Sequence, residues 1–266
     1  MLRKFRRRII TLTVILALLL GVYFEMTVFA PKRVRLRFET VTSSTLPASF
    51  NNSSVAVFSD VFSNVDNLRK AVAHINEFQP DMVLFAGNLF DTQPDDETVK
   101  IIQDLLASLP DKLGKYAVLG DVDANAANDI TRITLQNAGF RILDNGVTPI
   151  FNNSNESIQL VGLNTNTEPA FPSINEAFTL VLAHNPDVID QLSDKAIHLM
   201  VAGKSMNGQI RIPLLGSLLD GPQHDKKRET VNNTLLIQSS GVGNREPQLR
   251  LLTNPDVVII TLKNSQ

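Results

Sequence analysis

The 266-residue chain contains no cysteine, no tryptophan and only four histidines. The lack of cysteine excludes disulfide bonds, thiolate metal sites and a cysteine nucleophile. Four histidines also limit the number of imidazole ligands that a metal site could use. The chain is nevertheless 43% hydrophobic, which is enough for a folded core and excludes an intrinsically disordered protein. Its length suits one large domain or two small ones.

The charged residues are unevenly distributed, although the formal net charge is only −2. Residues 1–37 carry nine basic side chains and one acidic one, so this segment is +8 and the rest of the chain is −10. We expect no nucleic-acid partner for a chain with this balance. The basic head, residues 1–8, precedes the apolar residues 9–30, which are long enough for a helix to cross about 30 Å of hydrocarbon.

Two interpretations fit residues 9–30: an uncleaved signal anchor and a cleaved signal peptide. Val28 is a poor match to the small residue that a cleavage site ending at Ala30 requires, and Pro31 would hinder cleavage. The anchor is therefore preferred. The positive-inside rule keeps residues 1–8 in the cytoplasm and exports the remainder. We expect a single-pass protein of the cell membrane with an extracytoplasmic domain, for which the lack of disulfides is no obstacle.

The exported part begins with a first strand and a linker, residues 31–54, and continues as one domain, residues 55–266. The alternating KRVRLR of residues 32–37 predicts the strand, and the polar residues 40–54 predict the linker. Up to residue 138, buried-strand runs alternate with helical stripes; after residue 141, short apolar runs indicate a strand-rich half. The pattern predicts an α/β fold, mixed α+β in its second half, with mixed sheets flanked by helices. The predicted strands lie at 55–59, 82–86 and 116–119, and the predicted helices at 65–75, 95–109 and 130–138.

Polar residues follow the first three buried strands, at the carboxyl ends where sites form in α/β folds. The segments are SDVFS with Asp60, AGNLFD with Asn88 and VLGDVDAN with Asp121, and they are followed by LAHNPD with His184 and AGKSMNGQIRIP with Lys204. In order and position these motifs resemble those of the calcineurin-like metallophosphoesterases, especially the exported or membrane-anchored bacterial branch. The resemblance covers residues 35–263 and implies a metallophosphoesterase-like β-sandwich of mixed sheets flanked by helices, plus one N-terminal transmembrane helix.

The resemblance also implies a centre for two metal ions, but most of its ligand positions are substituted. Asp60 and His184 match the family's motifs, whereas Asn88 replaces the bridging aspartate and Asp121 replaces an asparagine. The remaining histidine positions hold residues of other kinds: Phe62 in the D-x-H motif, Val122 at the general-acid position, and Lys204 and Met206 in the G-H-x-H motif.

These substitutions are unfavourable for metal binding. Two divalent ions about 3.5–4 Å apart need an anionic bridge, and Asn88 offers only a neutral amide. Phe62 and Val122 have no lone pair, Met206 is a soft thioether, and Lys204 brings a positive charge. We therefore expect a decayed centre with no catalytic residue and no cofactor. Its vestigial metal positions are Asp60, Asn88, Asp121 and His184.

Two hypotheses describe what fills the centre. In the first, the Lys204 ammonium pairs with Asp60 or Asp121; the alternative is that Lys204 points to solvent. In the second, Asp60, Asp121 and His184 hold one weakly bound Mn, Zn or Fe ion. Asp91 or Asp123 would then lie nearby, unless they serve turns or helix caps. The other histidines are expected to be structural, at His74 and His198, or in an exposed loop, at His224.

Two functions remain open. The first is a catalytically inactive, membrane-anchored module that binds an envelope protein, a lipid headgroup or a cell-wall polymer. The second is a residual metal-dependent phosphoesterase, for which the family resemblance implies phosphomonoester, phosphodiester or lipid-linked phosphate substrates. The sequence identifies neither a ligand nor an oligomeric state.

Overall fold

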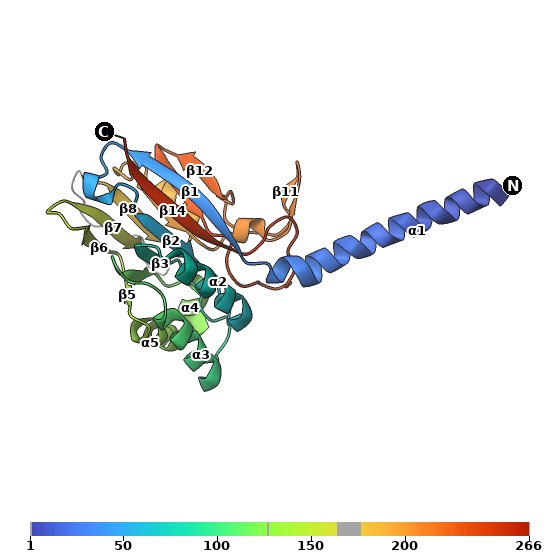
Figure 1. Cartoon of the computed structure of the whole chain (residues 1–266), viewed down its shortest axis with the longest axis horizontal. Helices are drawn as coiled ribbons and strands as arrows, with labels where there is room; N and C mark the ends of the chain where they lie inside the picture. The colour runs from blue at the N-terminus through green and yellow to red at the C-terminus, as the bar shows by residue number, and fades with distance from the viewer. Residues whose placement is uncertain (1, 127, 164–176, 266) are drawn as a thin grey trace.

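The computed structural model describes residues 2–126, 128–163 and 177–265. Helix α1 (Leu2–Phe24) projects away from the body of the protein (Figure 1). It continues into a π-helical turn, η1 (Glu25–Phe29), and a 3-10 turn, η2 (Ala30–Lys32). Residues 3–32 are long and apolar enough to cross a membrane, and their most apolar stretch is 0% buried in the body.

The body is built from two six-stranded sheets packed face to face. Both sheets contain parallel and antiparallel pairs, which confirms the predicted mixed α/β architecture. The first sheet has the order β1 (Arg35–Ser43), β14 (Asp256–Asn264), β2 (Ser54–Phe58), β3 (Met82–Phe85), β4 (Lys115–Ala117) and β5 (Phe140–Ile142). The second has the order β12 (Arg228–Val231), β13 (Thr234–Gln238), β9 (Leu199–Ala202), β8 (Thr179–Ala183), β7 (Ser157–Leu163) and β6 (Gly146–Phe151).

Apolar residues on both faces of the first sheet explain its central place in the fold. Val55 and Val57 of β2 point into the core between the sheets, whereas Ala56 and Phe58 point toward the helices. This alternation follows from the two-residue period of a strand. The helices α2 (Val65–Phe78), α3 (Asp96–Ala107) and α5 (Asn128–Asn137) cover that outer face. The 3-10 helix η4 (Pro186–Leu192) packs on the outer face of the second sheet.

The first strand differs from the expected linker. We expected residues 40–54 to be a linker, but β1 continues to Ser43 as the edge strand of the first sheet. All nine residues of β1 pair in parallel with β14 through backbone hydrogen bonds, and Val41 is buried against the inter-sheet core. Pairing partners distant in sequence therefore override the polar composition. The short elements that were not predicted include α4 (Asp121–Ala126) and β11 (Gly216–Ser217), which pairs with β10 (Arg211–Ile212) in a hairpin.

Candidate functional site

Three polar residues meet at the carboxyl ends of neighbouring strands. Asp60, Asn88 and Asp121 follow β2, β3 and β4, which lie side by side and run parallel. Asp60 and Asn88 have φ angles of 52° and 63°, in the left-handed region that short polar side chains tolerate best. These turns bring the side chains from separate loops into one group, in which Asp60 and Asn88 are buried and Asp121 is partly exposed.

Asn88 lies at the centre of this group. Its Nδ2 atom is 3.1 Å from Asp60 Oδ1, 3.2 Å from Asp121 Oδ1 and 3.0 Å from His184 Nε2. Its Oδ1 atom accepts a hydrogen bond of 3.1 Å from the Val122 amide. The Asn88 side chain therefore directs its NH2 group, which can only donate, at the carboxylates and so toward the place where a metal ion would lie. This orientation follows from the requirement that the Val122 amide find an acceptor.

His184 follows β8 and is completely buried. Its Nδ1 atom lies 2.6 Å from the Ala86 carbonyl oxygen and its Nε2 atom lies 3.0 Å from Asp121 Oδ1. Burial opposes protonation, but the hydrogen bond to Asp121 and the charges of Asp60 and Asp121 raise the pKa of the imidazole overall. The Nδ1 atom faces a backbone carbonyl oxygen, and the Nε2 atom faces both Asp121 and the Asn88 amide, so both ring nitrogens are engaged by protein groups.

Lys204 forms the ion pair that the first hypothesis predicted, with Asp121 rather than Asp60. Its Nζ atom lies 3.0 Å from Asp121 Oδ2, and its backbone amide donates to Asp60 Oδ2 at 3.0 Å. The Lys204 and Asp121 side chains are 28% and 40% exposed, which places this pair at the mouth of the site. Hydrogen bonds from His184 and, more weakly, Lys204 hold the pKa of Asp121 far below its ordinary value despite partial burial.

The four ionisable side chains of the group are two acids and two bases. Asp60 and Asp121 are acidic, Lys204 is cationic, and the raised pKa of His184 favours its cationic form. Unpaired carboxylates in such a buried place would be costly, and here each one is met by a cation or a hydrogen-bond donor. Asp60 Oδ2, for example, accepts a hydrogen bond of 2.6 Å from Ser59 Oγ. We call this group, with Asn88 at its centre, the polar network.

The polar network does not fit a dinuclear metal centre. Phe62 and Val122 supply no ligand atom, and Met206 is a buried thioether. Asn88 directs its NH2 group at the carboxylates, and Lys204 places an ammonium beside Asp121. Within residues 2–126, 128–163 and 177–265, no group of three or more His, Asp or Glu side chains is arranged to hold a metal ion.

Comparison with known proteins agrees with the strand-end motifs. The sequence model of the calcineurin-like phosphoesterase family matches residues 53–203. The chain belongs to this family. It is 24% identical over 260 residues to the uncharacterized metallophosphoesterase YkuE of Bacillus subtilis, covering 92% of this chain and 91% of YkuE. It is 30% identical over 205 residues to the phosphodiesterase YaeI of Escherichia coli, covering 72% and 74%. A solved structure from Thermus thermophilus matches 73% of this chain and 92% of its own, with a TM-score of 0.46 and 10% identity.

The two further aspartates do not join the polar network of this member of the calcineurin-like phosphoesterase family. Asp91 is exposed and accepts a hydrogen bond of 2.7 Å from Ser63. Asp123 is completely buried, and burial raises its pKa although backbone hydrogen bonds oppose the shift. The interpretation of Asp123 as a turn residue is confirmed, because its carboxylate accepts from the backbone amides of Asn88, Leu89 and Gly120 at 2.6, 2.8 and 2.9 Å.

His224 differs from the expected exposed loop residue. Its side chain is only 11% exposed and lies 3.2 Å from both Asp190 Oδ1 and Glu229 Oε1. Helix η4 carries Asp190 against the loop, so an acidic partner distant in sequence holds the ring. His74 lies within α2 and His198 directly precedes β9, as the sequence indicated. Neither histidine takes part in the hydrogen bonds of the polar network.

Two further residues, Arg250 and Gly120, support the polar network. Arg250 is completely buried, which lowers its pKa to about 10 against the opposing charges of Asp256 and Asp60. Its guanidinium donates to the carbonyl oxygens of Met206, Ser240 and Gly243, at 3.3, 2.8 and 2.7 Å. Gly120 lets the β4 turn approach Asn88, since a Cβ atom there would lie 2.1 Å from Asn88 Oδ1. Gly120 stands in the VLGDVDAN motif, where a turn was expected, whereas the contacts of Arg250 were not predicted from the sequence.

Proposed function

We propose that this chain is a catalytically inactive member of the family, a membrane-anchored module that binds or scaffolds a partner at the cell envelope. The observation that carries the proposal is the polar network. Lys204 and His184 provide the positive charge that metal ions provide where the family's motifs are intact. Val122, at the position of the general acid, has no group that could exchange a proton.

The N-terminal segment supports an anchored location. Residues 9–30 number 22, which corresponds to a helix of about 33 Å and matches a hydrocarbon core of about 30 Å. The basic residues 1–8 favour the cytoplasmic side, so residues 31–266 face the outside. The exported domain then carries the polar network into an envelope compartment, where it meets proteins, lipid headgroups and cell-wall polymers.

The experiment that tests inactivity uses the purified full chain in detergent with added Mn²⁺ or Zn²⁺. We expect no hydrolysis of phosphomonoesters or phosphodiesters, and no heat of binding in calorimetric titration with either ion. Phosphate release that disappears in both Asp60→Ala and His184→Ala would overturn the proposal, because it would assign the activity to the polar network.

One observation favours a second candidate, a residual metal-dependent phosphoesterase. YaeI, 30% identical to this chain, is named a phosphodiesterase, and Asp60, Asp121 and His184 still converge. A single Mn, Zn or Fe ion would have to displace the Lys204 ammonium from Asp121. The Lys204→Ala variant separates the two candidates, since it removes the competing charge. We expect Lys204→Ala to bind no metal tightly, because Asn88 still presents its NH2 group.

The binding partner is an envelope protein, a lipid headgroup or a cell-wall polymer. Pull-down of the intact anchored protein from its own membranes tests this part of the proposal. A Lys204→Glu variant is the matched control, because it reverses the charge at the mouth of the site and leaves α1 unchanged. A partner that is captured by the wild type and lost with the variant would be assigned to the surface around Lys204.

A further inference from the structure

The hairpin of β10 and β11 carries an exposed apolar tip. Leu214 and Leu215 lie between its two strands and are 106% and 73% exposed. Leu218, directly after β11, and Leu252, in the neighbouring tail, are 55% and 66% exposed. Leu214 and Leu252 also line a groove of about 350 Å³. Exposed leucines on one hairpin and its neighbouring tail are unfavourable in water, and apolar surface of this kind marks an interaction site. We call these residues the leucine patch.

Backbone hydrogen bonds connect the leucine patch to the end of the apolar N-terminal helix. The Arg211 amide at the base of the hairpin donates to the Leu251 carbonyl oxygen at 3.0 Å. The next residue back along the tail, Arg250, donates from its amide to the Met26 carbonyl oxygen at 3.0 Å. Figure 1 shows the hairpin on the side of the body from which α1 leaves.

The position of Met26 fixes the level of the patch relative to a bilayer. The apolar run begins at Ile9, and about 20 helical residues span the hydrocarbon core, so the outer boundary falls near Val28. Met26 is two residues from that point, which is about 3 Å along a helix. The segment bonded to Met26 therefore lies at the outer interface. Lys32 and Arg35, both exposed, follow immediately and suit anionic headgroups.

We propose that the leucine patch inserts into the outer leaflet of the bilayer beside α1 and forms a second membrane contact of the exported domain. The inference rests on the proposed membrane anchor. Leucine side chains at the tip enter the boundary between headgroups and acyl chains, as the apolar faces of interfacial segments do. Because η5 (Met206–Gly208) links Lys204 to this hairpin, the contact holds the mouth of the polar network close to the membrane surface.

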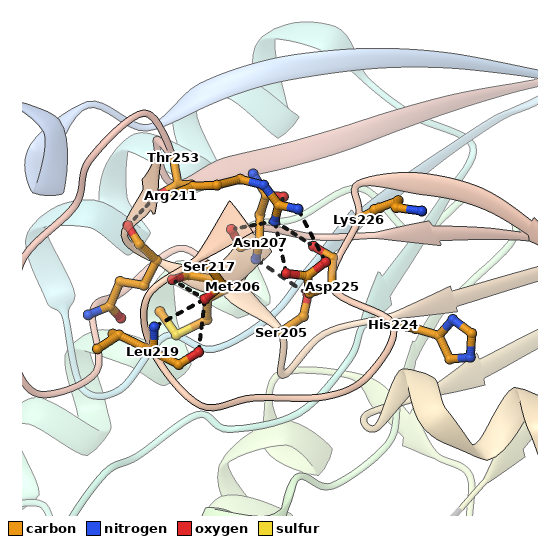
Figure 2. Close-up of polar contacts among 12 residues, drawn as sticks. Ser205, Met206, Asn207, Arg211, Ser217, Leu219, His224, Asp225, Lys226 and Thr253 are labelled. Atoms are coloured by element: carbon orange, nitrogen blue, oxygen red, sulfur yellow. Dashed lines mark hydrogen bonds and ion pairs between the residues drawn. The ribbon is translucent and has the colours of Figure 1, made fainter. Parts of the chain in front are cut away.

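The hairpin is held in place before it meets a membrane. Figure 2 shows the Arg211 guanidinium directed at Asp225, with Nη1 to Oδ2 and Nη2 to Oδ1 distances of 3.0 and 3.3 Å. Ser217 Oγ lies 2.8 Å from the Leu219 carbonyl oxygen and 3.1 Å from that of Gly208. These contacts fix the strands, and the Leu215 amide donates to the Ile212 carbonyl oxygen at 3.2 Å within the turn, so little conformational entropy is lost on insertion.

The test uses the full chain in vesicles of phosphatidylcholine and phosphatidylglycerol, at a low protein-to-lipid ratio. Because the chain has no cysteine, each single-cysteine variant carries one environment-sensitive fluorophore. Leu214→Cys reports on the patch, Leu19→Cys on the middle of α1, and Ile133→Cys on an exposed apolar position of α5, away from the membrane. We expect the Leu214 label to shift to shorter wavelength and lose emission with lipids spin-labelled near the headgroup end. The Ile133 label should change in neither respect.

The outcomes separate the patch from the anchor. Quenching at Leu19 without quenching at Leu214 would overturn the inference and leave the anchor intact. Absence of quenching at both would overturn the anchor and the inference with it. A wavelength shift at Leu214 that grows with protein density, without quenching by lipid, would assign the patch to a second copy of the chain. A third outcome is a Leu214→Cys label that is unquenched in vesicles, while the free thiol of the same variant is protected from labelling in native membranes. This outcome would assign the patch to a partner protein. Assignment of the patch to a second copy or to a partner protein also overturns the inference.

Discussion

Replacing Lys204 by methionine tests the reasoning behind the polar network. Methionine keeps an unbranched side chain of similar length and removes the charge. The Lys204 ammonium lies 3.0 Å from Asp121 Oδ2, and its loss leaves that carboxylate with His184 as its remaining cationic partner among these four side chains. We therefore expect the variant to fold and to be less stable than the wild type at neutral pH.

The expected loss follows from the exposure of the pair. Fully exposed ion pairs contribute about 0.2–1 kcal/mol, whereas removal of one partner from a buried pair costs about 3–5 kcal/mol. The side chains here are 28% and 40% exposed, between these limits but open to solvent screening. We expect Lys204→Met to lower the free energy of unfolding by about 1–2 kcal/mol, which corresponds to a few degrees in Tm for a domain of this size.

Scanning calorimetry of the full chain in detergent measures this loss, and Lys100→Met is the matched control. Lys100 pairs with Asp104 on the surface of α3 at 2.7 Å, with side chains 74% and 60% exposed, so its loss should cost less than about 0.5 kcal/mol. A double-mutant cycle with Asp121→Asn isolates the pair from other effects of the methionine. Equal stability of Lys204→Met and Lys100→Met, with no coupling in the cycle, would refute the reasoning.

Three further variants probe the same site by the same calorimetry. Burial opposes protonation of His184, but Asp121 and Asp60 raise its pKa overall. The stabilisation is complete below the unfolded pKa of about 6.5 and is lost as pH rises through the folded pKa. The free energy of unfolding of the wild type should therefore decrease above pH 6.5, and His184→Gln should lack this contribution to the decrease. Asn88→Asp should cost about 1–3 kcal/mol, since it replaces the central NH2 donor with a third carboxylate; an unchanged Tm would contradict the geometry. Gly120→Ala should cost about 1–3 kcal/mol through the clash with Asn88 Oδ1, and wild-type stability would show that the turns are not held as described.

The elements with strong local patterns were predictable from the sequence. The strands β2 and β3 consist of consecutive buried apolar residues, and the stripe of α2 has the helical period, so both signals are local. The edge strand β1 is longer at its carboxyl end than predicted, because its pairing depends on β14, far along the chain. The short strand β5 was missed, because its pairing with β4 involves only three residues. The hairpin of β10 and β11 has only two residues in each strand, too few for any period to appear.

Within the site, the identities of the polar residues were predictable and their bonding was not. The motifs located Asp60, Asn88 and Asp121 because each follows a buried strand. The orientation of the Asn88 amide depends on the Val122 backbone, and the choice of Asp121 rather than Asp60 by Lys204 depends on the turn after β9. Arg250 comes from the C-terminal tail, and its hydrogen bonds to the carbonyl oxygens of Met206, Ser240 and Gly243 depend on the folded chain.

The substitutions in the site are easier to explain together than singly. An ammonium at Lys204 beside metal ions would be repelled by them, and carboxylates at Asp60 and Asp121 without metal ions would repel each other. The Lys204 ammonium pairs with Asp121, the raised pKa of His184 favours its cationic form, and Asn88 supplies the donor hydrogens that a bridging aspartate would lack. Restoring one ligand by mutation therefore adds an unbalanced charge. On this reasoning, recovery of a metal centre requires replacing Asn88 and Lys204 together, and either change alone lowers stability.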